Sequence, residues 1–172
     1  MQRMRTGVGF YALVFVAGFL TFALHEGGHW LAAVTLGHEG YFSLNQAGAR
    51  DAVGATDMLI ITAAGPTLTI AQGLVALALV QARRSAAAWV FLFWAAFMRF
   101  MATVISFWNP NDEARISQHF GLGTWALPVA VTLGLSVLLV VGSRRLGLGW
   151  KTLALSWVVA SAAITAVVFS GL

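Results

Sequence analysis

The chain has 172 residues, of which 59% are hydrophobic and 9% charged, and its mean hydropathy is +0.83. Soluble globular domains carry roughly 25% charged residues, so this composition excludes an ordinary soluble fold and indicates a membrane protein. Cysteine is absent, which excludes disulfides and thiolate metal sites. A pI of 10.7 would suggest nucleic acid as the partner of a soluble protein. Here most basic residues flank apolar segments, so we expect the lipid bilayer as the partner and no nucleic acid.

Five apolar segments are each long enough to cross a bilayer as a helix, which takes about 20 residues. They are 7–36, 57–80, 86–108, 124–141 and 150–172. Because a helix satisfies its own backbone hydrogen bonds in lipid, we predict an all-α integral membrane protein with about five transmembrane helices. All of 1–172 then forms one domain. The first apolar run is longer than a signal-peptide core and no small-x-small cleavage site follows it, so we expect a span there.

The first connection, 38–56, contains the sequence GYFSLNQAGA at 40–49. Its weak alternation and bounding glycines predict a short strand or β-hairpin, and the alternative is a polar surface loop.

Basic residues are distributed unevenly between the two sides that a five-span chain defines. One side carries no acid and has Arg3, Arg5, Arg83, Arg84, Arg144, Arg145 and Lys151. The other side mixes both signs: Arg50, Arg115, Glu39, Asp51, Asp112 and Glu113. The positive-inside rule therefore predicts a cytoplasmic N-terminus and an external C-terminus. The compact, Ala-rich chain suggests a bacterial inner membrane.

The sequence His25-Glu26-Gly27-Gly28-His29 lies inside the first apolar segment and is an H-E-x-x-H motif. On a helix the two imidazoles lie on one face and can bind one metal ion, with Glu26 near a water at that ion as general base. The two glycines would leave space for a substrate backbone. The alternative is a pair of structural histidines, but ionisable residues inside a membrane are costly and mark functional sites.

A hydrolytic zinc site needs a third protein ligand and an open position. The other histidines are His38 and His119, both interpreted as solvated loop residues. Asp112 directly follows the third segment in Trp108-Asn109-Pro110-Asn111-Asp112-Glu113, on the side of the membrane where His29 lies. We therefore expect Asp112 as the third ligand, with Glu113 as its rival.

These motifs together resemble the site-2 protease family of intramembrane zinc peptidases. The resemblance rests on HEGGHW in the first segment, Gly65-Pro66 opening the second, and Asn-Pro-x-Asp after the third, and it covers residues 20–113. It implies a zinc ion bound by His25, His29 and Asp112, water activation by Glu26, and cleavage of transmembrane protein substrates.

Three features depart from that family pattern. Glu113 follows Asp112 where the family has Gly, and Thr69 replaces an Asn that follows the Gly-Pro pair. Thr69 is therefore a candidate substrate contact. The family places its metal nearer the cytoplasm, whereas the charge distribution here places His25 nearer the outside.

Two further polar residues near the third segment each have two interpretations. Asn109 either donates a hydrogen bond to the developing oxyanion or caps the third helix before Pro110. Arg99, well inside that segment, either pairs with an acid in a wet cavity or snorkels to the interface. Tryptophans near segment ends are interpreted as interfacial anchors: Trp30, Trp108, Trp125 and Trp150.

The predicted function is therefore intramembrane zinc-dependent peptide hydrolysis, with one zinc ion per chain. Selection of the substrate would come from the membrane domain or from a regulatory membrane partner. The alternatives are a non-catalytic scaffold and a membrane zinc protease of the Glu-ligated type, which Glu113 keeps open. A di-iron hydroxylase would need many more histidine ligands than the four in this chain.

Overall fold

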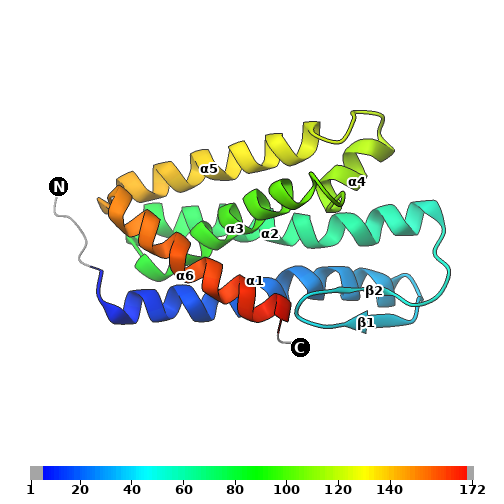
Figure 1. Cartoon of the computed structure of the whole chain (residues 1–172), viewed down its shortest axis with the longest axis horizontal. Helices are drawn as coiled ribbons and strands as arrows, with labels where there is room; N and C mark the ends of the chain where they lie inside the picture. The colour runs from blue at the N-terminus through cyan, green and yellow to red at the C-terminus, as the bar shows by residue number, and fades with distance from the viewer. Residues whose placement is uncertain (1–5, 170–172) are drawn as a thin grey trace.

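The structure, a computed structural model, describes residues 6–169. Within these residues the elements are α1 (Val8–Thr35), β1 (Gly40–Phe42), β2 (Ala47–Ala49), α2 (Ala55–Arg83), α3 (Ala86–Ile105), α4 (Asp112–His119), α5 (Ala126–Leu146) and α6 (Trp150–Phe169). Every helix except α4 is long and apolar enough to cross a membrane. The prediction of an all-α membrane protein with about five spans is confirmed (Figure 1).

The ends of two helices differ from the predicted segments: α5 is longer than predicted and α3 is shorter. Helix α5 runs past its predicted end at 141 through Arg144 and Arg145, and it stops at Gly147, whose φ of 69° is left-handed. Helix α3 ends at Ile105, before the predicted 108, because 106–108 form turns. The end of the predicted last segment, 170–172, lies outside the described residues.

The short helix α4 was not predicted, because 109–123 contains no long apolar run. Its start is nonetheless encoded locally. The side chain of Asn111 accepts a hydrogen bond from the backbone N–H of Asp112, and acids occupy the first turn. This cap fixes the start of α4 and so the directions in which the side chains of Asp112 and Glu113 point.

Helix α3 is the most buried of the spans, and the other helices surround it (Figure 1). Its buried aromatic residues form the centre of the main apolar core, against α1, α5 and α6. Helix α6 crosses α1 and α3 at an angle and remains largely exposed. The tryptophans expected as interfacial anchors have exposed side chains: Trp30, Trp108, Trp125 and Trp150.

The predicted hairpin in the first connection is confirmed. Strands β1 and β2 pair antiparallel, with Tyr41 opposite Gly48, and the turn is closed by Ser43 and Gln46. The hairpin lies along the C-terminal half of α1 (Figure 1). At this end of the bundle the hairpin, the N-terminal half of α2 and α4 all contribute residues to the lining of one cavity.

Candidate metal centre

Helix α1 places His25 and His29 one turn apart on a face that is buried against α2. Their Nε2 atoms lie 3.3 Å apart. Seventeen residues of α1 precede His25, so both histidines lie in the C-terminal half of this span. The helical spacing of the motif therefore brings both imidazoles to one point, as predicted.

Hydrogen bonds from α2 set the proton on each imidazole. Nδ1 of His29 lies 2.7 Å from the carbonyl oxygen of Ile61, which can only accept, so Nδ1 of His29 is the donor. Thr69 donates its hydroxyl proton to the carbonyl of Gly65, so its oxygen accepts from Nδ1 of His25 at 3.0 Å. Both neutral rings then carry the proton on Nδ1 and present the lone pair of Nε2.

The carboxylate of Asp112, in the first turn of α4, is the third group at this point. Its Oδ2 lies 3.2 Å from Nε2 of His25 and 3.5 Å from Nε2 of His29. The side chain of Asp112 is 13% exposed, so this carboxyl group is largely buried beside the two imidazoles.

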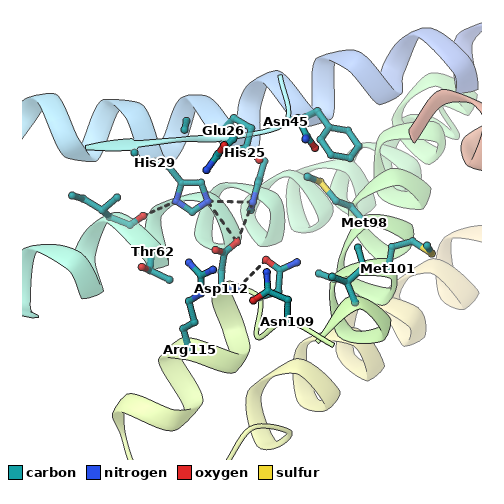
Figure 2. A pocket seen from close by; sticks show the side chains of 18 of the residues that line it. His25, Glu26, His29, Asn45, Thr62, Met98, Met101, Asn109, Asp112 and Arg115 are labelled. Carbon is teal, nitrogen blue, oxygen red and sulfur yellow. Dashed lines mark hydrogen bonds and ion pairs between the residues drawn. The ribbon is translucent and has the colours of Figure 1, made fainter. Parts of the chain in front are cut away.

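The three donor atoms fit a metal ion. Two imidazole lone pairs and one carboxylate oxygen converge within 3.2–3.5 Å, an arrangement that repels itself unless a cation lies among them. Ligands of a tetrahedral zinc ion, bonded at about 2.0–2.1 Å, are separated by about 3.3 Å, which matches the observed spacing. The buried group of His25, His29 and Asp112 could therefore hold a metal ion (Figure 2).

Gly65 on α2 is required by this arrangement. A Cβ built there would collide with Nε2 of His29 and Cε1 of His25. The next residue, Pro66, lies inside α2, so the Gly-Pro pair does not open the second span as predicted. The pair lies within the N-terminal half of α2, at the level where the two imidazoles pack.

Arg99 and Glu113 form a buried ion pair beside the three donors. Nη1 of Arg99 lies 2.9 Å from Oε1 of Glu113 and 3.9 Å from Oδ2 of Asp112, and Nη2 lies 3.4 Å from Nε2 of His25. The side chain of Arg99 is 2% exposed. It therefore pairs with an acid at a cavity and does not snorkel. Glu113 is occupied by this pair and lies outside the three-donor group.

A cavity of about 480 Å³ adjoins the site. Glu26, Asn45 and Asn109 lie around it (Figure 2). Arg99 and hairpin residues 46–49 complete this part of its lining. Asn109 does not cap α3, whose C-cap is Ser106; it lies in the turn that follows, with its side chain at the cavity. The general-base candidate and the oxyanion-donor candidate thus both border the space beside the three donors.

The remaining predicted residues lie elsewhere. Thr69 is behind His25 and is not part of the cavity lining. Gly28 packs against Ala64 and Leu68, so only Gly27 has the open space predicted for both.

The two other histidines lie away from the three-donor site. His119 lies at the end of α4, by a smaller hollow between α4 and α2. His38 hydrogen-bonds to Asp51 and to Asp57. These bonds raise the pKa of His38, and the bond to Asp51 has the larger effect.

Sequence reasoning missed the links between α2 and the imidazoles. Ile61 contributes a backbone carbonyl, which carries no signal in the sequence. Thr69 was singled out only by its place after the Gly-Pro pair. A four-residue spacing from Gly65 to Thr69 on the helix was the available signal, since it places both on one face.

The fold and the site together define an all-α membrane protein with a buried candidate metal centre at one end of its helical bundle. Comparison of the chain with protein-family models, with curated proteins and with solved structures finds no match in any of the three. Function therefore has to be argued from the site.

Proposed function

We propose that this protein is an intramembrane zinc endopeptidase of the site-2 protease type, which hydrolyses peptide bonds in or near the membrane-spanning segments of substrate proteins. The observation that carries the proposal is the convergence of three lone-pair donors at tetrahedral spacing beside a cavity that a carboxylate also borders. Two neutral histidines, one carboxylate and a nearby Glu are the groups that hydrolytic zinc sites use.

In this proposal His25, His29 and Asp112 hold the zinc ion. When bound, zinc supplies a Lewis acid that polarises a carbonyl and makes a water acidic near neutral pH. Glu26 takes a proton from the attacking water, whose oxygen bonds to the carbonyl carbon of the scissile peptide. Glu26 then returns the proton to the departing amide nitrogen as the C–N bond breaks. The second proton of the water leaves the new carboxyl group for the amine, so the products are one carboxylate and one protonated amine.

The hairpin offers a way to hold the substrate. Its residues 46–49 line the cavity, and a substrate segment that has unwound locally needs partners for its backbone hydrogen bonds. We propose that the extended substrate pairs with this edge as an added strand. Ala49→Pro, which removes a backbone donor of the same strand and spares the Ala47 N–H that hydrogen-bonds to Glu26, is then expected to slow cleavage and leave metal content unchanged; equal cleavage would contradict the pairing.

Two alternatives have specific consequences. A scaffold that binds no metal would not need two imidazoles whose protons are fixed on the side away from Asp112. A Glu-ligated site would need Glu113 among the donors, and Glu113 instead contacts Arg99 at 2.9 Å. The first observation favours a metal site, and the second favours Asp112 as its third ligand.

The proposed orientation follows the charges. Basic residues gather at the end of the bundle opposite the site: Arg83, Arg84, Arg144, Arg145 and Lys151. We therefore place the site toward the outer face and the N-terminus in the cytoplasm of a bacterial inner membrane. Because the chain lacks cysteine, Ser43→Cys in the hairpin turn and Gly149→Cys before α6 can be labelled singly. A membrane-impermeant maleimide should label only Ser43→Cys in intact cells; the reverse result would invert the topology.

The enzyme proposal is tested by metal content and cleavage together. The purified protein should contain about one zinc per chain by elemental mass spectrometry, as expected of a single three-ligand site. Asp112→Ala should lose that zinc, and Glu39→Ala, which removes an exposed acid near the hairpin, should retain it. The absence of zinc in the wild type after metal is supplied would overturn the proposal.

Cleavage is then measured on a panel of single-span membrane proteins in proteoliposomes, with new termini read by mass spectrometry. Glu26→Gln should retain zinc and lose about 10²–10⁴-fold in rate, the contribution typical of a general base. Zinc binding by the wild type with no cleavage of any panel member, and no difference from Glu26→Gln, would favour the scaffold.

A further inference from the structure

We infer that Arg99 is a catalytic residue of this site, the charged donor that binds the carbonyl oxygen of the scissile peptide as negative charge develops on it. Glu113 is the positioning residue that holds the guanidinium in place. This inference rests on the proposed hydrolytic function and assigns a role to the one arginine inside a membrane span that is buried at the site.

The guanidinium points at the same place as the three donor atoms. Its Nη2 lies 3.4 Å from Nε2 of His25, and its Nη1 lies 3.9 Å from Oδ2 of Asp112. Nε2 of His25 carries a lone pair, because Nδ1 holds the proton toward Thr69. When that lone pair binds a metal ion, the N–H of Nη2 loses its acceptor. It is then free for an oxygen in the adjoining cavity, which Arg99 lines.

The hydrogen-bond inventory of Arg99 also leaves donors unused. An arginine has five N–H donors, and the bond to Glu113 takes one of them. Within the described chain, the buried Nε of Arg99 has no hydrogen-bond partner. A structural ion pair at this depth would be expected to satisfy its donors, since each unpaired buried group is costly. An arginine that keeps an unpaired donor, and whose second contact is with the metal-facing Nε2 of His25, is instead suited to bind a ligand oxygen.

The nearby carboxylates explain why the positively charged guanidinium of Arg99 can lie so close to a metal site. A divalent ion would be balanced by the carboxylates of Asp112 and Glu26, and Arg99 by that of Glu113. This buried cluster is then neutral, which lowers the cost of placing it in a membrane protein. Arg115 also lines the cavity, but it is exposed and lies outside this balance. The family that the sequence resembles has Gly at the position of Glu113. This chain therefore has an acid there that can pair with the buried Arg99.

The chemical step follows from this placement. As the water oxygen bonds to the carbonyl carbon, the π electrons of the carbonyl move onto its oxygen. Arg99 donates a hydrogen bond to that oxygen while the charge is present. The electrons return as the C–N bond breaks and Glu26 protonates the nitrogen. A donor of this kind typically contributes about 10²–10³-fold to kcat.

The first experiment uses the metal and an anion, and needs no peptide substrate. Protein loaded with Co²⁺ is titrated with inorganic phosphate, a tetrahedral oxyanion, and binding is followed by the visible absorption of the metal. Arg99→Gln should retain Co²⁺ and weaken phosphate binding about tenfold or more, the loss expected for a charge-assisted hydrogen bond. Arg50→Gln, which removes an exposed arginine paired with Glu39, should bind phosphate as the wild type does.

The second experiment separates the role of Glu113 from that of a metal ligand. Glu113→Gln should weaken metal affinity, because it leaves the charge of Arg99 unbalanced beside the metal. The double variant Arg99→Gln with Glu113→Gln should recover metal affinity and still bind phosphate weakly. A metal loss in Glu113→Gln that the double variant does not recover would make Glu113 a ligand and overturn the pairing.

Kinetics on a cleaved panel substrate complete the test. Arg99→Lys should retain more kcat than Arg99→Gln and leave KM nearly unchanged, because the lost interaction belongs to the transition state. Wild-type phosphate affinity in metal-loaded Arg99→Gln, or no phosphate binding in the metal-loaded wild type, would overturn the inference alone. Failure of the wild type to bind metal would overturn the proposed function itself.

Discussion

The two ends of the bundle are stabilised in different ways. At the end that carries the basic residues, α3 packs by large apolar side chains, and Trp89, Phe93 and Phe97 stack along it with ring planes within 20° of parallel. At the other end, polar groups are held by hydrogen bonds between α1, α2, α3 and α4. Helix packing at the first end depends on the fit of apolar side chains. At the second end it depends on where protons and charges are placed.

This difference follows from the solvent. Between apolar surfaces in lipid no hydrophobic force drives association, so packing of close-fitting surfaces has to hold the helices together. A polar group in the same solvent needs a partner, so each one restricts where the helices can lie. A substitution at the packed end should therefore lower folding stability and leave metal affinity unchanged. A substitution at the polar end should lower metal affinity and leave folding stability nearly unchanged.

The largest expected effect is on stability, at the packed end. Trp94 is fully buried, and its Nε1 donates to the carbonyl oxygen of Val14 at 2.6 Å. Trp94→Ala leaves a large cavity and should cost about 3–5 kcal/mol of folding free energy. Thermal unfolding in detergent measures it, with the exposed Trp108→Ala as control. Equal unfolding temperatures for the two variants would contradict a packed end held by Trp94.

A single methyl group should distinguish the two ends. Gly65→Ala places a Cβ against His25 and His29 and should weaken metal affinity about tenfold to a hundredfold, given the usual cost of overpacking. Gly18→Ala meets the ring of Trp94 at 2.5 Å, so it should lower stability with metal affinity unchanged. Gly27→Ala, with open space around it, should change neither. Competition with a metal-sensitive chelator gives the affinities, and a loss of affinity in Gly27→Ala would contradict this account.

A smaller effect is expected from the hydroxyl group behind His25. Thr69→Val keeps the shape and removes the acceptor for Nδ1, so metal affinity should fall about tenfold, as for other partners of metal-bound histidines. Thr69→Ser should retain the wild-type affinity. Thr67→Val, which removes an exposed hydroxyl bonded to Ala63 on the same helix, is the matched control. Equal affinity in Thr67→Val and Thr69→Val would remove the role given to Thr69.

The smallest effect concerns the base of the hairpin and its dependence on pH. Both nitrogens of His38 contact carboxylates, of Asp51 and Asp57, which requires the doubly protonated ring. The pKa of His38 is raised above its ordinary 6.5 and that of Asp51 is lowered below 3.8. We call the two contacts of His38, with Asp51 and Asp57, the clasp. The clasp is therefore fully formed between pH 3.8 and pH 6.5. It weakens as pH rises through the raised pKa of His38 or falls through the lowered pKa of Asp51.

Hydrogen exchange of the 40–49 amides, corrected for intrinsic rates, measures this clasp. Protection should decrease as the solution becomes alkaline, and His38→Gln should abolish that dependence. His119→Gln, at the end of α4, serves as the control. Protection that rises with pH in the wild type would contradict the assignment.

The sequence by itself determined the class of fold and most of the donor set. Long apolar runs predict helical spans because a helix satisfies its backbone hydrogen bonds within one continuous segment, and the H-E-x-x-H spacing predicts two imidazoles on one helix face. Both are local properties, set by residues within a turn or a span of one another. The hairpin was predicted for the same reason, from alternation over ten residues and the glycines that bound it.

Only the tertiary structure decided how Asp112 and Glu113 divide their roles. The two acids are adjacent in the sequence, and the local pattern fits either as a ligand. Helix α4 and its cap at Asn111 direct one toward the histidines and the other toward Arg99. The same holds for the proton on each imidazole, which depends on a carbonyl of Ile61 and a hydroxyl of Thr69 in another helix. Contacts between distant segments decide these points, because lipid forces every buried polar group to find its partner wherever the helices bring one.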